Sequence, residues 1–404
     1  MTILIMYNGA DGLGGIETLM AQFAAYFLAK GHRTICLLRD ARPIRSLFLD
    51  GIEVVSEGRC LSRHLNPLRL KAMMKRRGLL EVDSVIAMDR VTAIVAVLMC
   101  GLTKSRRSRC VATNWVPNYL DGMFKRPFHP MSLLQRWTLQ RFYCSSTLLF
   151  MNSEYDAQGR KMFGSSWSTT LFPVSVDVDR FRMIERSPVR GRVVSIGRLQ
   201  PMKEYNLYMI DIVASLLKRG FDVNWDVYGY GEYEGVMRHR IQEMKLSESV
   251  RLRGPAARED VPHVLSTAMI FVGMGRAVME AAAAGVPNIV ALAYDSTGMT
   301  HGSLRRLPFG IVGERLEGLP LKPVEEEIVR ILGLSDAEYE IESADEFRST
   351  ARYDDQVVMK VLEDAFVGGP ILCCGWPFKF SCWVYSVTRE VAAMIGIRQT
   401  GKVS

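Results

Sequence analysis

The 404-residue sequence has no long apolar run. A membrane-spanning helix needs about 18 or more apolar residues in succession, and the longest candidate here, residues 93–102, has only the length of a buried helix. The start of the chain lacks a signal-peptide pattern, because Met1 leads directly into the strand-like run Ile3-Leu4-Ile5-Met6. The eight cysteines include no Cys-x-x-Cys pair, which argues against a zinc knuckle. We therefore expect a cytoplasmic protein without structural zinc.

A complete dinucleotide-binding fingerprint is also missing. Gly12-Leu13-Gly14 supplies the first two glycines of the Gly-x-Gly-x-x-Gly pattern, but Glu17 occupies the third position, which disfavours a dehydrogenase. The loop still precedes a helical pattern, so its backbone N–H groups suit a phosphate or an acceptor beside one. An ordinary strand-to-helix turn would give the same sequence signal.

Acidic residues are scarce in the first half of the chain. Residues 1–182 contain 25 Lys and Arg against 14 Asp and Glu, whereas the remainder contains 26 against 29. The basic side chains cluster around residues 71–77 and 104–109. Such clusters suit an anionic surface, such as lipid head groups, nucleic acid or an acidic substrate, and a plainly solvated face is the alternative.

The order of apolar runs predicts two α/β domains, each with a parallel sheet. Strand, glycine loop and amphipathic helix alternate from residue 2 onward, and a second series of the same plan begins near residue 192. We expect residues 1–182 to form an acceptor-side domain, completed by a C-terminal helix at about 355–404, and residues 183–354 to form the nucleotide-sugar-binding domain. Two facing Rossmann-like domains would place the carboxyl ends of their strands across a common cleft.

Two short stretches carry the chemistry of the second series. Arg198 and Lys203 follow its first strand and its Gly197 turn, and two cations beside a turn suit a diphosphate, although a solvated surface turn is the alternative. Glu280 lies in the apolar helix pattern that follows Gly275, where an acid is expected to face only a polar ligand or solvent. Cations together with an acid predict a nucleotide-sugar site.

In this order and spacing, the motifs resemble those of a retaining glycosyltransferase of family 4, with the GT-B architecture. The resemblance covers most of residues 1–300. Its motifs are Gly14-Gly15-Ile16-Glu17 with Gly31-His32, Val176-Asp177-Val178-Asp179-Arg180-Phe181, Gly197-Arg198-Leu199 with Lys203, Tyr228-Gly229-Tyr230-Gly231, and Glu280-Ala281 with Gly285-Val286-Pro287.

The resemblance implies a role for each matching residue. Arg198 and Lys203 correspond to the pair that holds the donor diphosphate and stabilises the departing nucleotide, and Glu280 corresponds to the acid that binds the donor ribose. Gly14 and Gly15 correspond to the loop near the diphosphate. The other expected donor contacts are Gly197, Gly229, Gly275 and Arg276. The resemblance also implies that no metal and no cofactor are needed beyond the nucleotide-sugar substrate.

Two positions depart from the family pattern. An acid that commonly contacts the transferred sugar is replaced by Val272, so that Arg276 becomes a candidate for the donor site. A histidine expected after the strand at residues 111–113 is replaced by Asn114 and Trp115. Asn114 is suited to bind a sugar hydroxyl and Trp115 to stack on a sugar face, but neither is a general base.

The last segment, residues 369–404, is rich in aromatic residues and cysteine. Pro370, Pro377 and Lys379 argue against a spanning helix. Two interpretations remain open: an aromatic anchor in a membrane interface, or a segment that packs on the N-terminal domain.

The sequence therefore predicts a metal-independent hexosyltransferase that acts on a glycan or lipid-linked acceptor in cell-surface polysaccharide or glycolipid synthesis. It would be cytoplasmic, peripheral on the inner face of the membrane if the basic half binds an anionic surface, and without a nucleic-acid partner. A nucleotide-sugar epimerase of the same fold is one alternative, and it would convert the donor without an acceptor. A catalytically weak nucleotide-sugar-binding relative is another, and it would bind the donor without turnover.

Overall fold

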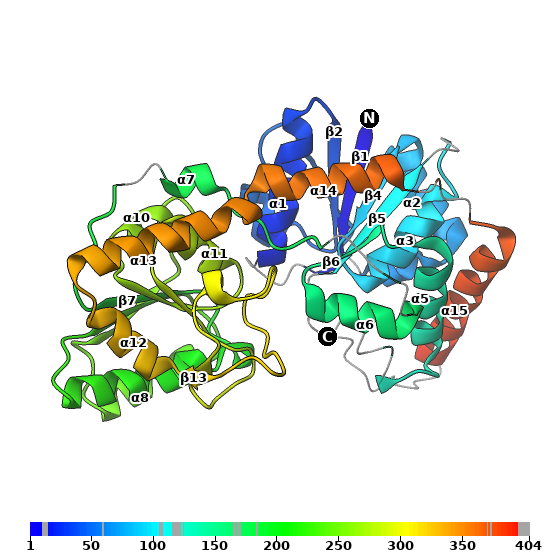
Figure 1. Ribbon diagram of the computed structural model, residues 1–404. Coiled ribbons are helices and arrows are strands. Elements are labelled where there is room, and N and C mark those ends of the chain that lie inside the picture. The colour runs from blue at the N-terminus through cyan, green and yellow to red at the C-terminus, as the bar shows by residue number, and fades with distance from the viewer. Residues whose placement is uncertain are drawn as a thin grey trace. The chain divides into compact units, whose positions relative to one another are not determined.

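The chain folds into two compact units (Figure 1). The computed structural model describes residues 1–9, 15–58, 60–104, 108–114, 123, 125–164, 167, 171–182, 185–369, 371 and 374–394. Unit 1 consists of Met1–Phe172 and Met359–Ser404, and unit 2 consists of Pro173–Val358. The chain thus leaves unit 1 ten residues before the predicted boundary at 182 and returns to it within helix α14 (Asp355–Gly368).

Unit 1 is built on a six-stranded parallel sheet with the order β3-β2-β1-β4-β5-β6. The four middle residues of β1 are fully buried and apolar, as expected for a central strand that helices cover on both faces. The strands are β1 (Thr2–Tyr7), β2 (Arg33–Leu38), β3 (Glu53–Ser56), β4 (Ser84–Ala87), β5 (Arg109–Asn114) and β6 (Leu148–Phe150).

The helices of unit 1 begin at side-chain caps that the sequence supplies. Asp89 forms a capping box with Thr92 at the start of α3, and Asn66 and Asn152 accept backbone N–H bonds at the starts of α2 and α6. The helices described before the return of the chain are α1 (Gly15–Ala29), α2 (Pro67–Arg76), α3 (Arg90–Cys100), α5 (Pro130–Phe142) and α6 (Ser153–Phe163). The C-terminal helix α15 (Trp376–Met394) packs against α5 and α2.

Unit 2 contains a five-stranded parallel sheet with the order β11-β10-β7-β8-β9. The strands are β7 (Arg192–Ile196), β8 (Asn224–Tyr228), β9 (Val250–Gly254), β10 (Ile270–Gly273) and β11 (Asn288–Val290). A short antiparallel pair follows, β12 (Met299–Thr300) with β13 (Lys322–Pro323). The helices are α7 (Val178–Arg182), α8 (Tyr205–Lys218), α9 (Glu234–Glu243), α10 (Val261–Ser266), α11 (Arg276–Ala283), α12 (Val324–Leu332) and α13 (Asp336–Ser349).

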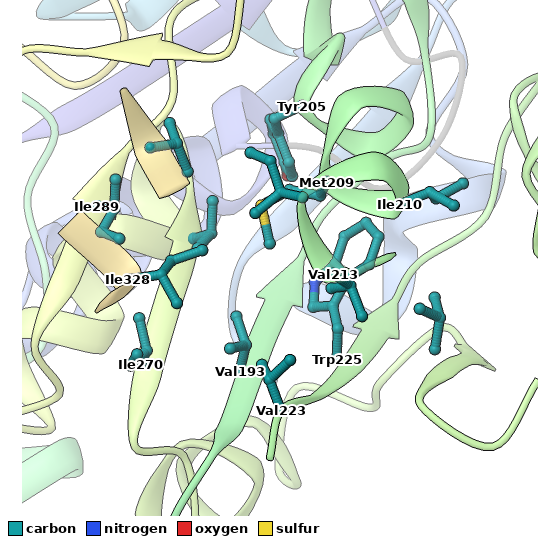
Figure 2. Close-up of a cluster of buried hydrophobic side chains, with 14 of the residues drawn as sticks. Val193, Tyr205, Met209, Ile210, Val213, Val223, Trp225, Ile270, Ile289 and Ile328 are labelled. Atoms are coloured by element: carbon teal, nitrogen blue, oxygen red, sulfur yellow. The ribbon is translucent and has the colours of Figure 1, made fainter. Parts of the chain in front are cut away.

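A core of large apolar side chains lies between the sheet of unit 2 and helices α8 and α12 (Figure 2). Trp225 of β8 is fully buried, and its indole nitrogen donates to Ser195 Oγ at 2.9 Å. Ser195 Oγ in turn donates to the Val272 carbonyl oxygen at 2.6 Å, which joins β7 to β10 through side-chain as well as backbone bonds. These bonds join β7, β8 and β10, so the loops that follow the three strands are held in fixed positions relative to one another.

No helix in the described ranges is both long and apolar enough to cross a bilayer. Helix α15 is 19 residues long, and Pro377 is tolerated because it occupies the first turn, where its missing N–H costs no helical bond. Helix α15, the main described part of the C-terminal segment, packs on unit 1, as one of the two interpretations predicted, while the aromatic-anchor interpretation stays a prediction.

Candidate functional site

The two predicted stretches of unit 2 meet where its strand order reverses. The chain runs from β7 outward to β8 and β9 on one side, and to β10 and β11 on the other. Such a reversal opens a crevice between the carboxyl ends of the two middle strands. Gly197 follows β7 directly, and Gly275 lies two residues beyond β10. The topology therefore brings both stretches to one edge of one sheet.

Glycine lets the loops at this edge pack backbone against backbone. The amide of Gly197 donates to the Tyr228 carbonyl at 2.8 Å, and the amide of Leu199 donates to the Tyr230 carbonyl at 2.9 Å. A Cβ added at Gly229 would overlap the Gly197 carbonyl oxygen, and one added at Gly231 would overlap the Leu199 carbonyl oxygen. The close approach of Gly229 to Gly197 is thus sufficient to require glycine at this position. A contact between Gly229 and the donor stays a prediction.

Lys203 and Arg198 form a pair of cations on the loop after β7. Lys203 ends a short 3-10 turn that starts at Pro201, and its ammonium group lies over Gly197, where any side chain would overlap it. Burial, helped by the positive charge of Arg198, lowers the pKa of Lys203 from 10.5 to about 8. Neither cation makes an ion pair with any residue in the described ranges. The pair is thus a concentrated positive charge that an anion would stabilise.

The second stretch starts with Gly275, whose backbone conformation is one that only glycine adopts readily. Gly275 caps α11 with φ 72° and ψ −147°, and nothing lies within 4 Å of the position its Cβ would take. Arg276 Nε donates to Glu280 Oε1 at 2.8 Å, and the two side chains are only 10% and 17% exposed. The expectation that Glu280 faces only ligand or solvent is therefore wrong. The spacing of four residues on one helix could have revealed this pair.

Val272 contributes nothing polar to the site. The side chain is fully buried in the core of unit 2. The replacement of the family's acid by Val272 therefore leaves this position without a carboxylate that could contact a transferred sugar.

Sequence reasoning missed Arg258, which follows β9 at the same edge of the sheet. Its pKa is lowered by burial and by the positive charges of Arg180 and Arg276, while Glu280 and Asp177 act in the opposite direction. Arg180, on α7, donates to the Arg258 carbonyl oxygen. Arg258 thus lies close enough to interact electrostatically both with Arg180 of α7 and with the Arg276–Glu280 pair of α11. The rule that carboxyl ends of parallel strands converge was the only signal that could have identified Arg258.

The candidate residues of unit 1 are described only in part. Gly15 begins α1 and has open space beside it, whereas Gly14 and Trp115 lie outside the described residues. Asn114 ends β5, and its side chain also lies outside the description. The roles assigned to these four residues therefore stay predictions.

Two Rossmann-like units with parallel sheets, joined in one chain, are the architecture of GT-B proteins, and the predicted fold class is confirmed. Residues 181–299, which contain Arg198, Lys203, Arg276 and Glu280, match the model of the family described as glycosyl transferases group 1.

A curated relative is mannosylfructose-phosphate synthase of Agrobacterium fabrum, which is 29% identical over 151 residues, or 34% of this chain. The chain spans only about a third (31%) of the length of that relative.

Solved structures resemble nearly the whole chain in fold. Anabaena HepE, determined with UDP and glucose, has a TM-score of 0.64 and 16% identity, and the match covers 91% of this chain and 99% of that chain. Sucrose-phosphate synthase from Thermosynechococcus elongatus has a TM-score of 0.62 and 14% identity, with 91% and 98% covered. A Staphylococcus aureus TarM variant, determined with fondaparinux, α-GlcNAc-glycerol and UDP, has a TM-score of 0.59 and 10% identity, with 90% and 99% covered. At these identities the likeness concerns the fold.

Proposed function

We propose that this protein is a retaining glycosyltransferase that transfers a sugar from a nucleotide-sugar to a glycan or lipid-linked acceptor. The observation that carries the proposal is that Arg198 and Lys203 follow β7 and the Arg276–Glu280 pair follows β10, the two adjacent strands at the switch point of the unit 2 sheet. The match of residues 181–299 to a glycosyltransferase family supports it. So do the structural neighbours, of which HepE was determined with UDP and glucose.

In this proposal Lys203 and Arg198 bind the diphosphate and stabilise it as it leaves the sugar. Negative charge develops on the leaving phosphate when the glycosidic bond breaks, and fixed cations that need no reorganisation stabilise that charge strongly. Burying the charged form of Lys203 costs free energy, and its lowered pKa reflects this cost. A bound anion offsets the cost, so the charged ammonium is stabilised strongly when the diphosphate binds. The two cations then do the work for which other enzymes use a divalent metal, and activity in excess EDTA is the expected result.

Glu280 is proposed to accept hydrogen bonds from the ribose hydroxyls of the donor. Its Oε1 atom is bound to Arg276, so the carboxylate is oriented by a partner on its own helix and presents its second oxygen to the ligand. The acceptor is proposed to be a precursor of a cell-surface polysaccharide or glycolipid, since unit 1 contains the chain's whole excess of basic residues, with 28 Lys and Arg against 15 Asp and Glu.

The test is a thermal-shift screen of the full chain with UDP, GDP, ADP and their sugars, followed by turnover with the best donor. Lys203→Met should lower affinity for that donor by roughly 10- to 100-fold, as expected when a charge-assisted hydrogen bond of about 1.5–3 kcal/mol is lost. Lys218→Met, on an exposed position of α8, is the matched control and should leave affinity unchanged. Unchanged affinity in Lys203→Met would show that the donor binds elsewhere.

The stereochemistry is checked on the product. Retention predicts that the new glycosidic bond has the anomeric configuration of the donor, read from the one-bond and three-bond couplings of the anomeric proton by NMR. An inverted product would refute the retaining mechanism, and conversion of the donor without any acceptor would identify an epimerase instead.

A further inference from the structure

The C-terminal helix α15 has one buried face and one exposed aromatic face. Phe378, Cys382 and Ser386 recur every four residues and are at most 4% exposed, so this row packs onto unit 1. On the opposite side Trp376, Phe380, Trp383 and Val384 are 72%, 45%, 39% and 37% exposed. An unbroken row of large apolar side chains at this exposure marks an interaction site rather than an ordinary soluble surface.

The exposed aromatic rings are ordered among themselves. Trp376 and Phe380 stack with their centroids 5.0 Å apart and their planes 12° apart. Phe380 and Trp383 continue the row at 5.8 Å and 25°. In this row neighbouring rings stack face to face along one helix, and such pre-ordered rings can enter an apolar layer with little loss of conformational freedom.

Helix α5 extends the exposed surface at the start of α15. The Trp137 ring contacts the Phe378 ring at a centroid distance of 5.3 Å, and Trp137 is itself 38% exposed. Leu133, one turn earlier on α5, is 50% exposed. Figure 1 shows α15 and α5 side by side at the rim of unit 1.

Helix α2 borders the other end of α15. Arg69 of α2 forms an ion pair with Glu390, and Arg389 donates to Ser62 Oγ at 2.6 Å, in the 3-10 turn (Leu61–Leu65) that precedes α2. Together α2, α5 and α15 contain eight Lys or Arg residues and one acidic residue. Four of these basic residues are exposed and make no ion pair with any described part of the chain: Lys71, Lys75, Arg76 and Arg136.

We propose that this face docks on an anionic lipid bilayer, with the aromatic row of α15 in the interface and the basic residues of α2 and α5 over the head groups. Tryptophan and phenylalanine beside unpaired cations are the combination that binds the interface of an anionic membrane. A second copy of this chain is a poor occupant, because a symmetric contact would bring the two basic surfaces together. The proposal concerns unit 1 alone and does not depend on the proposed function.

Vesicle sedimentation of the full chain tests the proposal, with phosphatidylcholine vesicles compared with vesicles containing 30 mol% phosphatidylglycerol. Each basic residue near an anionic surface contributes about fivefold to binding, so Lys71→Glu combined with Lys75→Glu should weaken binding to the anionic vesicles by roughly 25-fold or more. The control is Lys218→Glu combined with Lys360→Glu, two exposed lysines outside this face, and it should bind as the native chain does.

The aromatic row is tested separately with brominated lipid. Bromine in the upper acyl chain should quench the tryptophan fluorescence of the native chain, and Trp376→Ser combined with Trp383→Ser should lose most of the quenching and at least tenfold in vesicle binding. Val236→Ser, at a position 53% exposed on α9, is the matched control.

Equal binding to neutral and anionic vesicles, or unchanged binding in the lysine variants, would overturn the proposal. It would also be overturned if sedimentation equilibrium showed a dimer that the tryptophan variants abolish, since a second copy would then cover the face. All the substituted side chains are exposed, so the melting temperatures of the variants should match that of the native chain. The lysine variants keep the test valid if the tryptophan variants are less stable.

Discussion

The depressed pKa of Lys203 predicts that donor binding takes up a proton at alkaline pH. Burial lowers this pKa from 10.5 to about 8 in the free protein, and a bound diphosphate should raise it again toward its ordinary value. At pH 8.5 about a quarter of the free protein carries the proton, whereas nearly all of the complex does, so binding should take up about three quarters of a proton. At pH 6.5 both states are protonated and the uptake should be close to zero.

Isothermal titration calorimetry in two buffers of different ionisation enthalpy measures this uptake directly. The nucleotide-sugar is the right ligand, because its diphosphate has no ionisation near neutral pH, whereas the terminal phosphate of a free nucleoside diphosphate does. If only the protonated form binds, the affinity should also fall about fourfold between pH 6.5 and 8.5. The same pKa gives a sign for stability: between pH 8 and 10.5 the unfolded chain holds more protons at Lys203, so its contribution to folding stability rises with pH in that window.

Two variants decide whether Lys203 is the group that takes up the proton when the donor binds. Lys203→Arg keeps the charge but cannot lose its proton in this range, so proton uptake should vanish while binding persists. Lys218→Met, an exposed lysine on α8, should leave the uptake as in the native chain. Uptake that survives in Lys203→Arg, or that is absent from the native chain at pH 8.5, would refute the assignment of the anion to Lys203.

Two further predictions concern the loops that carry the site. Glu280→Gln removes the ion pair with the largely buried guanidinium of Arg276, so the free energy of unfolding in urea should fall by about 1–3 kcal/mol and donor affinity by roughly tenfold; unchanged stability would mean that the pair is not formed. Gly229→Ala places a methyl group against the Gly197 carbonyl and should cost about 2 kcal/mol or more, whereas Gly235→Ala, where a methyl group meets open space in α9, should be neutral or slightly stabilising; equal melting temperatures for the two would contradict the close packing of the loops.

The sequence was sufficient to predict the first strand of each sheet, β1 and β7, because each is a short, largely apolar run with a glycine one or two residues after its end. It was not sufficient for α13, whose buried positions include Glu342, Ser343 and Glu346. Arg305 and Arg330 neutralise the two acids from other elements, so the inward face of this helix is polar and carries no apolar period. The C-terminal helix predicted at about 355–404 is divided in the structure into α14 and α15, and Pro377 is compatible with α15 because it lies in the first turn of that helix.

The candidate site shows the same division between local and tertiary information. Its cations could be predicted because they follow a strand at a fixed distance, but the property that makes Lys203 unusual depends on other elements. The ammonium lies over Gly197 because that residue has no side chain, and Gly197 is held there by a backbone bond to the carbonyl of Tyr228. Glycine at Gly229 is needed for that bond to form, since any larger residue would push the two loops apart. The glycines of this edge therefore affect the pKa of Lys203. Because they allow the loops to pack closely, the ammonium group is buried, and a bound anion would stabilise its charge.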